Sequence, residues 1–174
     1  MSSERVARNL TLLGFLGGSA AIAAAWGYQL IGGYVPCKLC LEQRIPYYVG
    51  LPLAALAIVL MMQRRAGLAT VVLLAVAAIF AYGSGLGIYQ SGAEWGFWAG
   101  PNDCGGGGAA PASAANMLQA LQSTRIVSCT EASWRMFGLS FAGWNAVASG
   151  GVALSALISA FLLNRRQNEA TLSV

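Results

Sequence analysis

Four long stretches without a charged residue constrain the fold of this chain more than any other feature. They lie between Arg8 and Lys38, Arg44 and Arg64, Arg65 and Glu94, and Arg135 and Arg165, and they hold 29, 19, 28 and 29 residues. A helix needs about 20 apolar residues to cross the hydrocarbon core of a bilayer. Each stretch is therefore long enough to supply one transmembrane helix.

Composition supports the same interpretation. The 174 residues are 57% hydrophobic and only 9% charged, whereas roughly 25% of residues are charged in soluble domains. We therefore predict an all-α membrane protein, a four-transmembrane-helix bundle in one integral membrane domain over residues 1–174. The spans are expected at about 10–33, 45–62, 68–90 and 138–163. A fifth uncharged stretch, 104–124, is rich in Gly, Pro, Ser, Asn and Gln and is not expected to span.

The first span is not expected to be a cleaved signal peptide. Its apolar run, "LTLLGFLGGSAAIAAAWGYQLIGGY", is longer than the roughly 7–15 residues of a signal's apolar region.

Basic residues predict the orientation. Six of them flank one side of the four spans: Arg5, Arg8, Arg64, Arg65, Arg165 and Arg166. The positive-inside rule then places both termini in the cytoplasm, with a short loop 34–44 and a long loop 91–137 outside. In a bacterium these two loops are periplasmic. The net charge of +4 follows from this topology, and no basic patch for nucleic acid is seen.

The long loop is expected to carry a short interfacial helix. From Pro111, the segment "PASAANMLQALQSTR" places Met117, Leu118 and Leu121 on one side of a helix that can lie on the membrane. A disordered linker is the alternative.

All four cysteines fall in the predicted outer loops. Cys37 and Cys40 form a Cys-x-x-Cys pair in the first loop, and Cys104 and Cys129 lie in the second. Disulfides persist in oxidising compartments such as the periplasm and are rare in the cytosol. The cysteines are therefore candidates for disulfide chemistry.

Metal and proton-relay chemistry fit this sequence poorly. The chain has no histidine, which excludes His-ligated haem and Cys/His zinc sites. A four-cysteine zinc site normally uses two Cys-x-x-Cys pairs, but 24 residues separate Cys104 from Cys129. The same spacing argues against an iron–sulfur cluster. No Asp or Glu lies within a predicted span, so a carboxylate relay of the transporter type is not expected.

The short Cys37–Cys40 ring favours redox chemistry over a structural role. A bridge over two residues removes little chain entropy, since the benefit grows with loop length. Cys-x-x-Cys pairs are instead commonly redox-active, with one thiol pKa lowered. We expect the start of the second helix and Arg44 to favour the thiolate of Cys40. Pro46 leaves open whether that helix begins before Cys40 or near Ile45. For Cys104 and Cys129, an inert structural disulfide is a fair alternative.

Electrons taken up by such a pair must leave through a membrane-soluble acceptor, and a quinone (ubiquinone or menaquinone) fits. Its carbonyl oxygens need a donor at the bilayer edge, for which Arg44 is suitably placed. The alternative for Arg44 is a side chain that reaches the lipid headgroups.

The segments "PCKLCLEQR", "IYQSGAEWGFWAGPNDC" and "SCTEASWRMFGLSFAGWNA" resemble the DsbB family of bacterial inner-membrane disulfide bond formation proteins, and its alphaproteobacterial members in particular. The resemblance covers nearly the whole chain. It implies a protein-disulfide oxidoreductase that re-oxidises a periplasmic thioredoxin-fold partner of the DsbA type.

By this resemblance Cys104–Cys129 would be the disulfide that accepts electrons, with the mixed disulfide formed at Cys104. Cys129 would then attack Cys37, and Cys40 would form a charge-transfer adduct with quinone held by Arg44. Relatives often carry a histidine near Gln90, which makes Gln90 a candidate quinone contact. Two other hypotheses stay open: a membrane scaffold with two structural disulfides, and the same chemistry run in reverse as a disulfide reductase.

Overall fold

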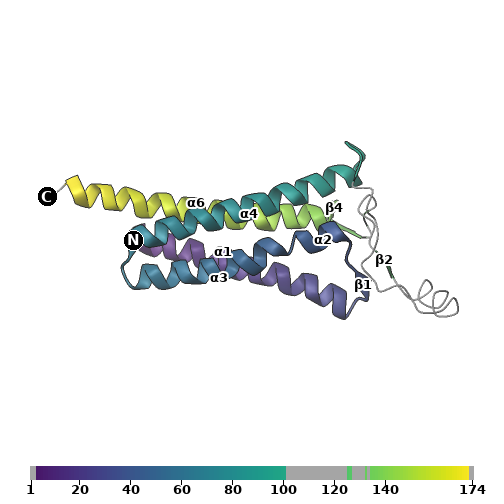
Figure 1. Cartoon of the computed structure of the whole chain (residues 1–174), viewed down its shortest axis with the longest axis horizontal. Helices are drawn as coiled ribbons and strands as arrows, with labels where there is room; N and C mark the ends of the chain where they lie inside the picture. The colour runs from purple at the N-terminus through teal and green to yellow at the C-terminus, as the bar shows by residue number, and fades with distance from the viewer. Residues whose placement is uncertain (1–2, 101–124, 127–131, 133, 173–174) are drawn as a thin grey trace.

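The computed structural model describes residues 3–100, 125–126, 132 and 134–172. Four long helices lie side by side: α1 (Ser3–Leu30), α3 (Ile45–Met62), α4 (Ala66–Glu94) and α6 (Phe141–Leu172) (Figure 1). Each of the four is long and apolar enough to cross a membrane. The predicted all-α, four-helix membrane bundle is confirmed, and the chain is a multi-pass membrane protein.

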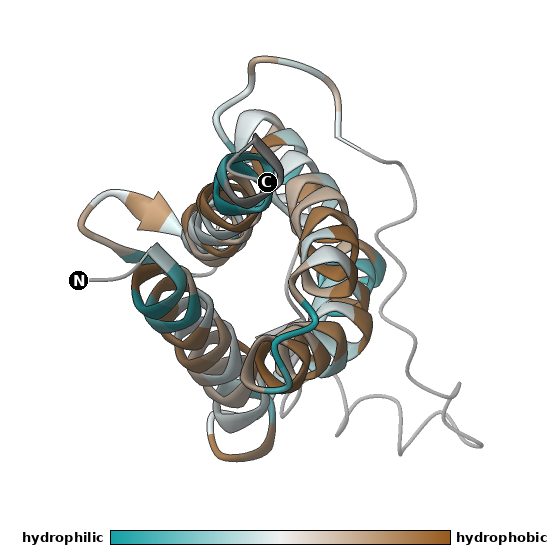
Figure 2. Cartoon of the chain, turned by 90° about the vertical axis from the view of Figure 1, so that its left-hand side faces the viewer, coloured by the Kyte–Doolittle hydropathy of each residue, from teal (hydrophilic) through white to brown (hydrophobic). Residues whose placement is uncertain are grey.

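The helices form a ring in the order α1, α3, α4, α6, in which each packs against two neighbours. Both termini lie at one end of the bundle, and all the connections that bear on the site lie at the other (Figure 1). Figure 2 views the bundle from the end that holds the termini and shows apolar residues along all four helices. Large apolar side chains such as Leu13, Val71 and Phe161 point outward and are more than half exposed, as expected of a surface that faces lipid.

Helices α1, α4 and α6 differ in extent from the spans expected from the sequence. Helix α1 begins at Ser3 rather than at residue 10, because Arg5 and Arg8 continue the helix beyond its apolar part. It ends at Leu30, before Gly33, whose φ of +68° suits glycine. Helix α6 begins at Phe141 rather than at residue 138 and runs on to Leu172. At the end of the bundle that holds both termini, Arg166 of α6 forms a salt bridge with Glu4 of α1.

The second and third spans are joined by a three-residue turn. Helix α3 covers the same residues as the predicted span 45–62, and its 18 residues are about 27 Å long. Helix α4 runs from Ala66 to Glu94, beyond the predicted 68–90 at both ends. In the turn, Arg64 has a φ of +59°.

Small residues allow the helices to pack closely. A Cβ at Gly87 would lie 2.8 Å from the carbonyl oxygen of Ala142 and from the amide nitrogen of Ala146. Only a glycine therefore lets α4 approach α6 at this point. Larger side chains fill the interior farther along, where Phe80, Leu73 and Leu163 are almost completely buried.

Short elements close the loop end of the bundle. The strand β1 (Tyr34–Val35) precedes the five-residue helix α2 (Lys38–Glu42), and β1 pairs in parallel with β2 (Arg125–Ile126). The strands β3 (Arg135–Met136) and β4 (Leu139–Ser140) form a hairpin directly before α6. Cys104, Cys129 and the interfacial helix expected from Pro111 lie outside the described residues.

Candidate functional site

The Cys-x-x-Cys pair starts helix α2. Cys37 is the N-cap, and its sulfur accepts a hydrogen bond of 3.3 Å from the backbone N–H of Cys40. The Cys37 thiol in turn donates to the Cys40 sulfur at 2.8 Å. Cys37 is 2% exposed and Cys40 is half-buried. Cys40 is thus the more accessible residue of the pair.

The pKa of the Cys40 thiol is lowered from 9.0 to about 7. The largest cause is the hydrogen bond from the Cys37 thiol, and the amide of Gln90 lowers the pKa further. Burial and the negative charge of Glu94 act in the opposite direction. A thiol with a pKa near 7 is about half ionised at neutral pH, and the thiolate is the nucleophile in thiol–disulfide exchange.

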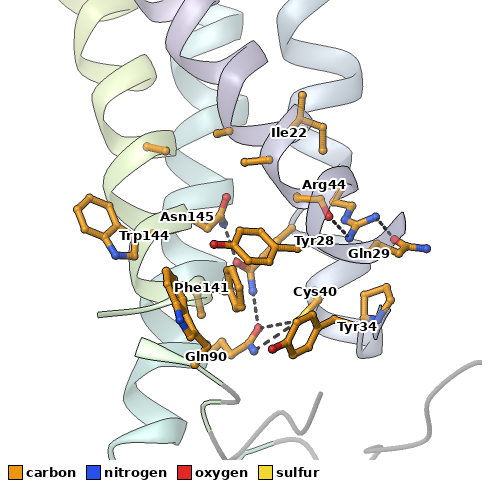
Figure 3. Close-up of a pocket in the computed structure, with 18 of the residues that line it drawn as sticks. Ile22, Tyr28, Gln29, Tyr34, Cys40, Arg44, Gln90, Phe141, Trp144 and Asn145 are labelled. Atoms are coloured by element: carbon orange, nitrogen blue, oxygen red, sulfur yellow. Dashed lines mark hydrogen bonds between the residues drawn. The ribbon is translucent and has the colours of Figure 1, made fainter. Parts of the chain in front are cut away.

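Cys40 lies in the wall of a cavity of about 430 Å³ at the loop end of the bundle (Figure 3). One part of the wall is made of small apolar residues of the helices: Ala21, Ile22, Ala24, Ala25, Ala142 and Ala148. The other part is polar: Gln29, Cys40, Gln43, Arg44, Gln90, Glu94 and Asn145. Such a cavity suits a flat apolar molecule with a few polar atoms at one end.

Aromatic side chains from three elements line the cavity between α1 and α6. The ring of Phe141 lies 4.7 Å from that of Tyr28 and 5.1 Å from that of Trp134, measured between centroids. Tyr34 also contacts Tyr28, at 6.3 Å. These rings give the cavity an amphipathic rim, since tyrosine and tryptophan carry both apolar faces and polar atoms.

Arg44 is a buried cation beside this cavity. It occupies the N-cap position of α3, and the residue is 8% exposed. Its guanidinium donates to the side-chain oxygen of Gln29 at 2.6 Å and to the carbonyl of Ala25 at 3.4 Å, and lies 5.3 Å from the ring centre of Trp26. Both acceptors are neutral. The site therefore presents a positive charge that an anion or a developing negative charge in the cavity would stabilise.

Polar side chains from three helices and a turn, three of them amides, join Cys40 to the bundle interior. The amide of Gln90 donates to the Cys40 sulfur at 3.7 Å, and its oxygen accepts from Gln43 at 2.5 Å. Gln43 accepts from Asn145 at 2.7 Å, and Asn145 accepts from the Tyr47 hydroxyl at 2.7 Å. The labelled members of this chain are seen in Figure 3. Because each amide uses both its donor and its acceptor, the network fixes the orientation of Gln90 toward the sulfur.

Comparison with known proteins identifies the family. The family model for "Disulfide bond formation protein DsbB" matches residues 7–159. The chain belongs to the DsbB family. Its general role is therefore disulfide bond formation as a thiol oxidase, and its class is oxidoreductase. No curated protein matches the chain, and no solved structure matches it.

In this DsbB-family protein, several of the residues singled out from sequence lie together. Cys37, Cys40, Arg44 and Gln90 all lie at the loop end, and the last three line one cavity. The structure decides between the two starts that Pro46 left open: α2 and α3 are separate helices, and α3 begins at Ile45. Hydrogen bonds from Cys37 and Gln90 lower the pKa of the Cys40 thiol, and the charge of Arg44 is not among the causes.

Sequence reasoning missed four polar residues of this DsbB-family site: Gln29, Gln43, Glu94 and Asn145. Gln29, Glu94 and Asn145 lie within a few residues of the loop-side ends of their helices, and Gln43 lies in the turn between α2 and α3. The available signal was a polar side chain at the edge of an apolar span, because polar residues are costly in a membrane and are often kept for function.

Proposed function

We propose that this chain is a quinone-dependent thiol oxidase that re-oxidises a periplasmic DsbA-type dithiol protein and passes the electrons to membrane quinone. The observation that carries the proposal is the position of Cys40. A sulfur with a lowered pKa lies in the wall of an amphipathic cavity that also holds a buried arginine. Membership of a thiol oxidase family is consistent with that arrangement.

The cavity residues fit a quinone, either ubiquinone or menaquinone. Its volume of about 430 Å³ accepts a substituted ring, and the alanines toward the membrane leave space for an apolar substituent. Arg44 would bind a carbonyl oxygen through N–H groups that can also contact Gln29. A bound quinone supplies a two-electron acceptor that leaves through the lipid.

The chain's own residues prepare the sulfur. The Cys37 thiol and Gln90 both donate to Cys40, so they stabilise its thiolate. Oxidation of the pair then needs only a small movement, because the two sulfurs are already 2.8 Å apart and a disulfide holds them about 2.05 Å apart. Arg44 stabilises negative charge that develops in the cavity.

The parallel pairing of β1 with β2 supports transfer between the two cysteine pairs. It sets Val35 beside Ile126, and Cys37 and Cys129 follow these residues by two and three positions. Three extended residues span at most about 11 Å, so a chain that leaves Ile126 is long enough to bring Cys129 to Cys37. We assign Cys129 the attack on Cys37, and Cys104 the mixed disulfide with the partner.

The proposed setting is the bacterial inner membrane. The end of the bundle with both termini carries Arg5, Arg64 and Arg165 and would face the cytoplasm under the positive-inside rule. The cysteine loops at the other end, 34–44 and 91–137, would then face the periplasm, where the thiol partner is found.

The test follows the redox state of each cysteine. The purified protein is reduced, then incubated with a reduced thioredoxin-fold partner with or without ubiquinone, and its thiols are alkylated and mapped by mass spectrometry. We expect all four cysteines to be alkylated without quinone and to be protected when quinone is added. Alkylation of all four despite added quinone would contradict the proposal.

A further inference from the structure

Glu94 has a buried oxygen atom that nothing in the described structure satisfies. It is the last residue of α4 and lines the cavity together with Cys40. One carboxylate oxygen, Oε1, accepts from the Gln90 amide at 3.3 Å. The other, Oε2, is buried and has no hydrogen-bond partner among the described residues.

A carboxylate oxygen in that position needs an explanation. Burying a charged polar atom without a partner is costly, and native structures satisfy most such atoms with protein, water or a ligand. Because Glu94 belongs to the cavity wall, a molecule bound in the cavity lies beside its carboxylate. The carboxylate is thus placed to exchange a proton with that molecule.

The reaction in this cavity requires protons as well as electrons. Oxidation of Cys37 and Cys40 breaks two S–H bonds and forms one S–S bond, and reduction of the quinone forms two O–H bonds. The chain has no histidine to carry a proton. Among the described residues, Arg135 is a charged neighbour of Glu94, because its guanidinium donates to the Glu94 carbonyl at 3.5 Å. The other titratable or charged groups near Glu94 lie in the cavity wall: Cys40, Arg44, Tyr28, Tyr34 and Tyr47.

We propose that Glu94 is the proton-transfer residue of the quinone site: its carboxylate takes up the proton that Cys40 releases and delivers it to a quinone oxygen. The inference rests on the proposed quinone reduction. The electron pair passes from the sulfurs to the quinone as the S–S bond forms. The first proton goes from Cys40 to Glu94 and on to the quinone. The second leaves Cys37 as its sulfur bonds to Cys40, and it reaches the quinone through cavity water. Glu94 ends as the carboxylate, ready for the next turnover.

The electrostatics of the pair agree with this role. The negative charge of Glu94 raises the pKa of the Cys40 thiol. When Glu94 takes up a proton, that opposition is removed and the thiolate is favoured. Loss of a proton by Cys40 and gain of a proton by Glu94 therefore assist each other.

The test compares Glu94→Gln with Glu94→Asp and with the control Glu42→Gln. Glutamine keeps an oxygen that can accept from Gln90 but carries no exchangeable acid proton, whereas aspartate keeps the acid. Glu42 is a half-buried carboxylate of α2 that does not line the cavity. Two quantities are measured: the pH midpoint of Cys40 alkylation in quinone-free protein, and the rate of quinol formation between pH 5.5 and 8.5.

We expect Glu94→Gln to lower the alkylation midpoint and to slow quinol formation about 100-fold, the lower end of typical acid–base contributions. Its rate should also fall as pH rises, because the proton now comes from solvent. Glu94→Asp should recover much of the rate, and Glu42→Gln should match the wild type in both measurements.

Two results would overturn the inference, and they are distinguishable. If the wild type reduces quinone and Glu94→Gln does so at the same rate with the same pH profile, the proton-transfer role is wrong and the proposed function stands. If the wild type itself forms no quinol, the proposed function fails and this role fails with it. In that second case the pH midpoint of Cys40 alkylation still reports whether the charge of Glu94 acts on the Cys40 thiolate.

Discussion

Replacement of Cys37 by alanine should remove most of the ionisation of Cys40 at neutral pH. The Cys37 thiol donates to the Cys40 sulfur at 2.8 Å and is the largest cause of the lowered pKa of about 7. Alanine has no donor, while burial continues to raise the pKa. The pKa should therefore return toward its ordinary value of 9.0. At pH 7 the thiolate fraction would fall from about one half to about one hundredth.

The assay is the rate of Cys40 alkylation by iodoacetamide as a function of pH, read on the mapped peptide of the reduced protein. The wild type should reach half its maximal rate near pH 7, and Cys37→Ala should do so about two pH units higher. Cys37→Ser is the matched comparison, because its hydroxyl still donates and should retain part of the shift. Leu41→Ala, at an exposed position of the same helix, should leave the midpoint unchanged.

A midpoint near pH 7 in Cys37→Ala would refute the reasoning. It would mean that the thiolate is stabilised by the charge of Arg44 or by the start of the helix, as sequence reasoning first suggested, and not by the neighbouring thiol.

Two further predictions concern Arg44 and the helix packing. Arg44→Met should raise the KM for quinone about 10- to 100-fold, since a hydrogen bond to a charged group contributes about 1.5–3 kcal/mol. The KM of Arg44→Lys should lie between those of the wild type and Arg44→Met. An unchanged KM, measured at a saturating concentration of the thiol partner, would argue against a contact between Arg44 and quinone. Gly87→Ala should lower the free energy of unfolding by about 1–3 kcal/mol, because its Cβ would lie 2.8 Å from backbone atoms of α6. Gly85→Ala, where a Cβ meets nothing within 4 Å, is the control in the same denaturation assay, and equal stability of the two variants would contradict the packing argument.

The bundle could be predicted from sequence because one physical rule dominates it. Charged residues are costly in a bilayer, so the uncharged stretches marked the four helices directly. Their ends were less predictable. Arg5 and Arg8 continue α1 as a helix outside its apolar part, and no hydropathy rule limits a helix once it leaves the membrane.

The site was predicted only where its chemistry is local in sequence. Cys37, Cys40 and Arg44 lie within eight residues, so their proximity was readable. Gln43 and Asn145 are 102 positions apart and meet because α6 is rotated to direct Asn145 inward. The hydrophobic patterning of helices that are apolar all round does not reveal such a rotation. For the same reason, the sequence did not predict that Gln29 accepts a hydrogen bond from Arg44.

The central claim is that electrons leave the protein from Cys40 to a quinone. Its most direct measurement is the amount of quinol formed per partner dithiol oxidised, followed by ultraviolet absorbance with the purified protein in liposomes that contain ubiquinone. We predict one quinol per dithiol for the wild type and none for Cys40→Ser. Leu41→Ala, at an exposed position that does not line the cavity, is the control and should match the wild type. Dithiol oxidation without quinol, or quinol formation that persists in Cys40→Ser, would contradict the account.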